Sequence, residues 1–197
     1  MSEAVGERMR AGSRESILAA ARRAAQAHGY GGLNFRDLAE DVGIKAASVY
    51  YHFPSKADLG AAVARRYRED TAAALEAMWA ETADPVLCLR RYPDLFRRSL
   101  ENGNRLCLGS FMSAEYDDLP EAVRREVQAF ADANVAWLSR VIAAAHGAAP
   151  EACAQRARAV FSAVAGAQLM ARSRSDIALF DDIIESYRKT GLLGQIG

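Results

Sequence analysis

The segment from Asn34 to Lys56 constrains the fold of this chain more than any other stretch. Asn34 suits the N-cap of a short helix, because its side-chain oxygen can accept a hydrogen bond from a free N–H of the first turn. Gly43 follows that helix and suits a turn of positive φ. Pro54 ends a second short helix. This layout predicts a helix-turn-helix, a motif that places one helix in the major groove of DNA.

The two helices of the motif differ in their residue patterns. Apolar residues at helical spacing predict the buried face of the first helix, and they are Phe35, Leu38, Ala39 and Val42. The second helix begins with small side chains that allow it to lie close against DNA, namely Ala46, Ala47 and Ser48. We expect Ser55 to cap the next helix, with Asp58 at its third position.

Residues 50–59 carry the sequence Tyr-Tyr-His-Phe-Pro-Ser-Lys-Ala-Asp-Leu. Together with the preceding motif, this stretch resembles the TetR family of one-component bacterial repressors, and the likeness runs over roughly residues 13–68. The resemblance implies an all-α fold. A three-helix DNA-binding head is expected at residues 1–54, and an effector-binding and dimerisation body at residues 55–197.

The resemblance also implies DNA contacts, position by position. Arg36 is expected to reach bases or phosphate from the first helix of the motif. Base edges are expected to face Ala46, Ala47 and Tyr50, and phosphates to face Ser48, Tyr51, His52 and Lys56. Hydroxyl, imidazole and ammonium groups can donate to phosphate oxygens, and alanine methyls can contact thymine methyls.

Two positions of this set need comment. Many relatives carry a lysine where this chain has Ala46, whereas here the lysine is one position earlier, at Lys45. Base recognition is therefore expected to rest on Arg36, Tyr50 and apolar contacts. Packing within the head is an equal alternative for Tyr50, and it is the preferred interpretation for Phe53.

The charge distribution agrees with a DNA-binding head. Residues 1–68 contain 11 Lys or Arg and 7 Asp or Glu, whereas the remaining residues contain 14 and 18. A basic head on an acidic body suits a protein that presents one end to DNA. The imbalance is small for one copy, but a dimer doubles it.

Several other classes of protein are disfavoured. No run approaches the ~18 apolar residues of a membrane-spanning helix, and the first twelve residues do not form a secretory signal. Three cysteines without paired spacing indicate a reducing cytoplasm. No metal or cofactor motif appears. Glu115, Asp117 and Asp118 are better explained as acceptors before a helix than as a cation site.

An enzyme is not expected, because the histidines are far apart in sequence and no nucleophile motif appears. Beyond the head, low glycine and proline content and abundant Ala, Arg, Glu and Leu predict helices throughout. We expect them at about 13–29, 55–81, 84–102, 104–116, 120–146, 150–173 and 176–190. The helices at 150–173 and 176–190 are expected to form the homodimer interface, with an ordinary monomer core as the alternative.

The body is expected to hold an effector. The helix at 120–146 places Asn134 among apolar residues that include Trp137, and Gln168 is similar on the next helix. A buried amide needs hydrogen-bond partners, which either the protein or an effector can supply. Phe111 is a further candidate for the lining of a cavity.

Cys107 is the sharpest candidate for sensing. With Asn104 as the expected cap, its thiol falls in the first turn of a helix beside Arg105, which favours a lowered pKa. The stretch 104–109 also resembles a subgroup of these repressors, some of which sense reactive aldehydes, quinones or oxidants. The alternative is a small buried residue that only packs.

These observations predict a homodimeric repressor that binds a palindromic double-stranded DNA operator. A small-molecule effector, or modification of Cys107 by an electrophile or oxidant, is expected to shift the 104–116 helix and then the 55–81 helix, so that the two heads no longer fit the operator. The alternative is a helical ligand-binding or adaptor protein that does not act through DNA.

Overall fold

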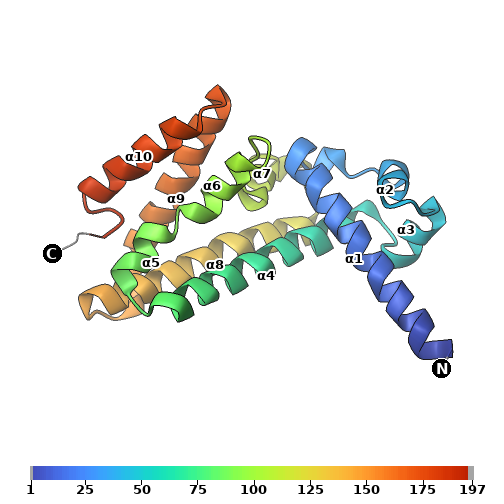
Figure 1. Ribbon diagram of the computed structural model, residues 1–197, viewed down its shortest axis with the longest axis horizontal. Coiled ribbons are helices and arrows are strands. Elements are labelled where there is room, and N and C mark those ends of the chain that lie inside the picture. Colours follow the sequence, from blue (N-terminus) through green and yellow to red (C-terminus); the bar gives the residue numbers. More distant parts are fainter. Residues whose placement is uncertain (1, 195–197) are drawn as a thin grey trace.

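A computed structural model describes residues 2–194, with side chains from residue 12 onward. These residues form ten α-helices and two short 3-10 helices, without a strand (Figure 1). The expected all-α class is therefore confirmed. Within the described part of the chain, none of the helices is long and apolar enough to span a bilayer.

The head lies at one end of the molecule and the body extends away from it (Figure 1). The head elements are α1 (Ser2–His28), η1 (Tyr30–Gly32), α2 (Phe35–Val42) and α3 (Ala46–His52). Their core contains the fully buried Ile17, Leu38, Val49, Phe53 and Leu59. Leu59 comes from the following helix, α4 (Lys56–Thr82), so α4 packs into the head as well as the body.

Local signals in the head act as the sequence predicts. Asn34 caps α2 by accepting a hydrogen bond from the N–H of Arg36 at 2.9 Å. Gly43 ends α2 in the left-handed region at φ 74°. Ser55 caps α4 by accepting from the N–H of Asp58 at 3.1 Å. These side chains satisfy backbone groups that a helix end leaves free.

The first helix begins earlier than expected. The sequence suggested a start at Ser13, but α1 begins at Ser2 and Ser13 lies in its interior. Residues 3–11 include Ala, Glu, Met and Arg, which favour helix, and no proline interrupts them. The end of α1 agrees with the prediction, because Gly29 follows it at φ 67°.

In the body, α4 lies alongside the long helix α8 (Glu121–His146), and α9 (Pro150–Arg174) packs against α8 on the side of α10 (Ile177–Lys189) (Figure 1). Two short helices, α5 (Pro85–Arg91) and α7 (Leu108–Ala114), pack against α4 and α8, and a third, α6 (Asp94–Glu101), packs against α9. Gly109 lets α7 approach α8 closely, because a Cβ at this position would lie 2.3 Å from the ring of Phe130.

The single helix expected at 84–102 is wrong. The chain forms α5 and α6 instead, with a break at Tyr92 and Pro93. Tyr92 and Pro93 keep helical φ and ψ, but Pro93 has no N–H to donate to the preceding turn, so the hydrogen bonding of a continuous helix is interrupted here. The break turns Tyr92 fully into the core, where its hydroxyl meets Asn134.

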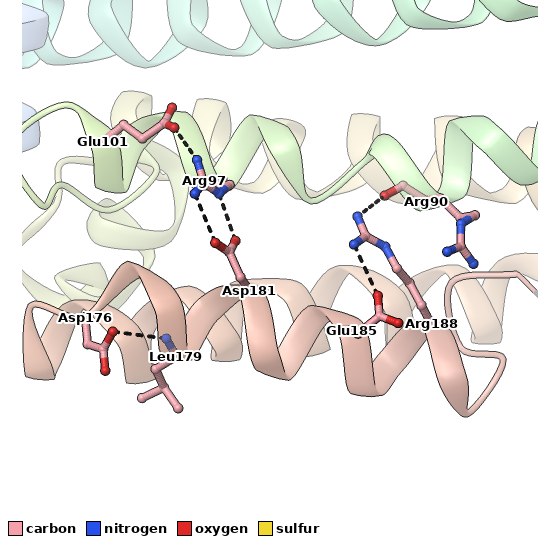
Figure 2. A network of polar contacts seen from close by, with 8 residues as sticks. All are labelled: Arg90, Arg97, Glu101, Asp176, Leu179, Asp181, Glu185 and Arg188. Atoms are coloured by element: carbon pink, nitrogen blue, oxygen red, sulfur yellow. Dashed lines mark hydrogen bonds and ion pairs between the residues drawn. The ribbon is translucent and has the colours of Figure 1, made fainter.

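The last helix, α10 (Ile177–Lys189), packs against α6 and α9. Figure 2 shows its polar contacts with the α5–α6 segment. Arg97 on α6 donates to both carboxylate oxygens of Asp181, at 2.8 and 3.0 Å, and also pairs with Glu101. Arg188 donates to the carbonyl of Arg90 at 2.9 Å. Because these groups are partly exposed, they contribute little stability, but they fix the position of α10 along α6.

Candidate DNA-binding face and effector cavity

The outer face of α3 presents polar and small side chains. Val49 is completely buried and anchors α3 to the head core. Lys45 and Ala47 are exposed, as are the rings of Tyr50 and Tyr51, at 57% and 68%. Each tyrosine offers an apolar ring and a hydroxyl that can donate a hydrogen bond to a partner molecule. This face is therefore chemically suited to contact another molecule.

Arg36 from α2 joins this face. Arg36, Tyr50 and Lys56 surround a shallow hollow of about 310 Å³, together with Leu33, Asn34 and Phe35. The ring of Tyr50 lies 4.6 Å from that of Phe35. Tyr50 thus packs with one edge on the head and leaves the rest of the ring exposed, so the structure accommodates both interpretations of this residue.

Lys56 already has partners in the head. Its Nζ donates to the carbonyl of Gly31 at 3.1 Å and lies 4.8 Å from the ring centroid of Tyr30. An ammonium group has three donors, so a phosphate contact is compatible with this position. The sequence did not indicate that Lys56 also holds η1 in place.

The remaining head residues are less exposed. Ala46, Ser48 and His52 are half-buried, and Ala46 packs partly against the hydrophobic core. Ala47 is therefore better placed than Ala46 for contact with a base edge. Phe53 is 2% exposed, which confirms that it packs inside the head.

A cavity of about 400 Å³ opens between the head helix α1 and the body. Its walls come from α1, α4, α6, the start of α7 and α8. The lining residues are Arg22, Arg23, Gln26, Tyr67, Asp70, Thr71, Ala74, Leu95, Phe96, Arg98, Ser99, Asn102, Cys107 and Phe130. Volumes of this size are typical of small-molecule sites.

Cys107 lines this cavity, but its local geometry differs from the expectation. Asn104 does not cap the helix. It takes φ 57° and its side chain donates to the carbonyl of Arg172 and to Ser175, at 3.1 and 3.0 Å. Cys107 itself is the N-cap of α7, and its Sγ accepts from the N–H of Ser110 at 3.3 Å.

The expected lowering of the Cys107 thiol pKa is wrong. Burial raises this pKa, because a thiolate loses its hydration in the apolar surroundings. Hydrogen bonds with Ser110 act in the opposite direction but are weaker. Arg105, which the sequence suggested as a stabilising charge, is not among the causes. The thiol is therefore mainly protonated at neutral pH.

The two amides singled out in the sequence have partners inside the protein. Asn134 accepts from the hydroxyl of Tyr92 and donates to the carbonyl of Phe130, both at 2.9 Å. Gln168 accepts from the N–H of Cys107 at 3.0 Å and donates to the carbonyl of Phe96 at 2.7 Å. Neither lines the cavity, so their burial requires no ligand.

The two aromatic candidates also lie outside the cavity lining. Trp137 is 3% exposed and stacks on Tyr92 with centroids 6.0 Å apart. Its indole N–H lacks a hydrogen-bond partner among the described residues. Phe111 lies under the guanidinium of Arg172 at 5.2 Å. The cavity was expected inside the body, whereas the structure places it beside the head.

Glu115 connects the body to the head, which sequence reasoning missed. Its carboxylate was expected to act as an acceptor at the start of α8, but the structure shows another partner. Its carboxylate accepts from the N–H of Tyr30 at 2.9 Å, just after α1. Gly29 allows this approach, because a Cβ there would lie 2.0 Å from Glu115 Oε1. We call this hydrogen bond the Glu115–Tyr30 latch. No group of potential metal ligands occurs in the described residues.

One face of α9 remains open to solvent. Ala159, Gly166, Leu169 and Met170 are exposed, with Leu169 at 58% and Met170 at 48%. Ala167, between these residues in the sequence, faces inward and is 1% exposed. Helical geometry puts residues three, four and seven apart on one face, so this set lies on one side of α9, and we call it the apolar stripe.

Comparisons with known proteins agree with this architecture. Residues 17–63 match the family model described as bacterial regulatory proteins, tetR family. A TetR transcriptional regulator from Legionella pneumophila is 29% identical, has a TM-score of 0.82, and aligns over 89% of this chain and 95% of that one. A TetR-family regulator from Agrobacterium tumefaciens is also 29% identical, with a TM-score of 0.78 and coverage of 90% and 96%.

The reduced form of Escherichia coli NemR has the same fold, with a TM-score of 0.78, 20% identity, and coverage of 90% of this chain and 96% of that one. A comparison with curated proteins gave no match.

Proposed function

Since this chain belongs to the TetR family of bacterial regulatory proteins, we propose that it is a homodimeric transcriptional repressor of a palindromic operator. The family is one of DNA-binding transcription regulators; repression, the operator and the dimer are the proposal. The observation that carries it is the exposed face of α3, where Tyr50 and Tyr51 are 57% and 68% exposed beside Lys45 and Ala47.

Each group on this face has a role in DNA recognition. Lys45 and the hydroxyl of Tyr51 donate to phosphate, and these contacts position the head without reading sequence. Arg36 and Tyr50 border one hollow and face the base edges, where the guanidinium can donate to guanine. Ala47 has no bulk beyond its methyl, so α3 can enter deeply into the major groove.

The apolar stripe on α9 supports the homodimer. Gly166 and Ala159 allow two helices to approach closely, and Leu169 and Met170 provide apolar surface that a second copy would bury. A two-fold axis along this face gives two heads in opposite orientation. Their half-sites would lie one DNA turn, about 34 Å, or a multiple of it apart.

The division between head and body near residue 55 is part of the same proposal. Ser55 caps α4, and α4 contributes Leu59 to the head core and Leu75 to the body core. A rigid helix shared by both parts transmits a displacement in the body to the head. We place the DNA-binding unit at residues 1–54 and the regulatory unit at 55–197 on this basis.

An effector in the cavity beside Cys107 would act through α7. This helix begins at Cys107, which lines the cavity, and its C-cap is Glu115, which holds the N–H of Tyr30. A ligand that displaces the start of α7 therefore moves the Glu115–Tyr30 latch. Allosteric coupling of ~1–3 kcal/mol would weaken operator binding by roughly 5–150-fold.

Modification of Cys107 is a second trigger, which its place in the cavity lining supports. A buried, protonated thiol reacts slowly with reagents in bulk solvent. Electrophiles that first occupy the cavity are therefore the expected reagents, and reversible binding is the principal trigger.

DNase footprinting on the DNA that flanks the gene for this chain tests the proposal. A repressor of this kind protects a palindrome, and an Arg36→Ala, Tyr51→Phe variant weakens the protection, whereas Arg125→Gln at an exposed position of the body does not. Failure of the wild-type protein to protect any palindrome would favour the adaptor alternative.

A further inference from the structure

We propose that the cavity between α1 and α6 binds a small carboxylic acid with an apolar body, and that this ligand contacts the DNA-binding head directly. The inference rests on the proposed function for its regulatory meaning, but the site itself is defined by the cavity alone. The bound acid would touch α1 on one side and α6 on the other.

Gln26 is the first observation that indicates a ligand. This α1 residue lines the cavity and is only 7% exposed. Its side-chain amide makes no hydrogen bond to any residue from 12 to 194, in contrast to the two satisfied amides Asn134 and Gln168. The amide is not among the fully buried unpartnered groups of the described residues, and it therefore reaches the open cavity with its donors unused. A ligand oxygen in the cavity would accept from Gln26.

Three arginines and one carboxylate, that of Asp70, line the cavity, so the lining charges favour an anion. Arg22 is held by Asp70 at 2.8 Å, and Arg23 by Asp41 at 2.7 Å. Arg98 on α6 also lines the cavity, yet its guanidinium makes no ion pair or hydrogen bond within the described residues. A guanidinium binds a carboxylate in a two-pronged geometry. Arg98 is therefore the group that receives the acid.

The floor of the cavity is apolar and aromatic. Phe96, Phe130 and Leu95 contribute hydrocarbon surface that favours an apolar ligand body. Tyr67 adds a hydroxyl, and burial raises the pKa of this phenol, so it remains a hydrogen-bond donor at any physiological pH. The cavity lining thus combines hydrocarbon surface with hydrogen-bond donors.

The position of the cavity gives the ligand a short route to DNA. Gln26 lies in the same helix as the head core residue Ile17, and Arg98 lies in α6, which Arg97 ties to α10. A ligand held by Gln26 and Arg98 sets the separation of α1 from α6. It changes the tilt of the head without any displacement having to cross the body core.

Isothermal titration calorimetry of the full-length chain tests the site. The probes are benzoate, 3-phenylpropionate and octanoate, each beside its neutral amide. We expect at least one acid to bind, and its amide to bind at least tenfold more weakly. Arg98→Gln and Gln26→Leu should each lower the affinity for that acid by ~10–100-fold, as for a hydrogen bond to a charged group.

Arg125→Gln is the matched control, because Arg125 is also an exposed body arginine but lies outside the cavity, and it should leave the affinity for the acid unchanged. The proposal is overturned if none of the three acids binds, if acid and amide bind equally, or if Arg98→Gln binds the acid as well as the wild type does.

Operator binding, measured on the same samples, distinguishes failure of the cavity assignment from failure of the proposed function. If no acid binds but the protein still binds its operator, only the cavity assignment is overturned. Acids that bind a protein without affinity for any DNA would overturn the repressor and leave the cavity assignment in place.

Discussion

Substitution of Gly29 by alanine should uncouple the head from the body. Gly29 has φ 67° and ψ −162°, a conformation that is almost exclusive to glycine and costs other residues about 1–3 kcal/mol. The new Cβ would lie 2.0 Å from Glu115 Oε1 and 2.4 Å from Cδ. The carboxylate must therefore leave its position, and the Glu115–Tyr30 latch opens.

The expected loss is the sum of two terms. Backbone strain contributes about 1–3 kcal/mol, and loss of a hydrogen bond to a carboxylate contributes about 1.5–3 kcal/mol. Gly29→Ala should therefore lower the free energy of unfolding by about 2.5–6 kcal/mol. Gly31→Ala is the matched control, because Gly31 has open space around a Cβ and does not have positive φ.

Urea unfolding at fixed protein concentration measures these free energies, and Glu115→Ala completes a double-mutant cycle with Gly29→Ala. Each single variant loses the same hydrogen bond, so the double variant should be more stable than the sum of the single losses by about 1.5–3 kcal/mol. In the same variants, a ligand that releases the wild-type protein from its operator should lose most of its effect.

Two results would refute this reasoning. One is a Gly29→Ala protein as stable as Gly31→Ala. The other is simple additivity of Gly29→Ala and Glu115→Ala, within the ~0.5 kcal/mol expected of independent sites. Either result would mean that Glu115 does not hold the head.

Further variants test the remaining contacts. Tyr51→Phe should weaken binding to all DNA sequences alike and lower its salt dependence, whereas Tyr50→Ala should also relax base preference. Anisotropy titrations against operator and scrambled duplexes distinguish the two variants. An unaltered base preference in Tyr50→Ala would refute the role of Tyr50 in base recognition. Leu169→Glu should yield monomers with little operator affinity in sedimentation velocity, in contrast to Glu121→Ala; a dimeric Leu169→Glu would move the interface elsewhere. Because its pKa is raised, Cys107 should react slowly with iodoacetamide at pH 7 and faster as the pH rises above the ordinary thiol range; rapid labelling at pH 7 would contradict its burial. Cys107→Ser should abolish derepression by electrophiles and keep operator binding, and a fully responsive variant would leave Cys107 as a packing residue.

The head was predictable because its signals are local. Asn34, Gly43 and Ser55 each act on the backbone within a few residues, so their roles follow from the sequence alone. The break at Pro93 could also be predicted, since a proline inside a helical pattern indicates an interruption of the helix. The predicted helix at 84–102 passed over that signal.

The site in the body was less predictable because it depends on contacts between distant segments. Asn134 and Gln168 are polar residues on apolar faces, and a sequence cannot tell whether Tyr92 or Cys107 will satisfy them. Gln26 differs from them, because none of residues 12–194 forms a hydrogen bond with its side chain. Only its place in an alanine-rich helix hinted at burial.

Cys107 illustrates a competition between two effects. Its position at a helix start favours a thiolate, but burial opposes charge more strongly. The sequence shows the first effect and not the second. The role of Glu115 was missed for a similar reason. Its acidic neighbours suggested that it accepts hydrogen bonds at the start of α8, whereas its partner, Tyr30, is 85 positions earlier in the chain.

Fluorescence anisotropy with the palindromic DNA protected in the footprint tests the central claim most directly, because stoichiometry and salt dependence come from one titration. The account predicts two chains per palindrome, tight binding that falls steeply as salt rises, and a large loss when one half-site is scrambled. A single chain bound, or equal affinity for the intact and half-scrambled duplexes, would contradict it.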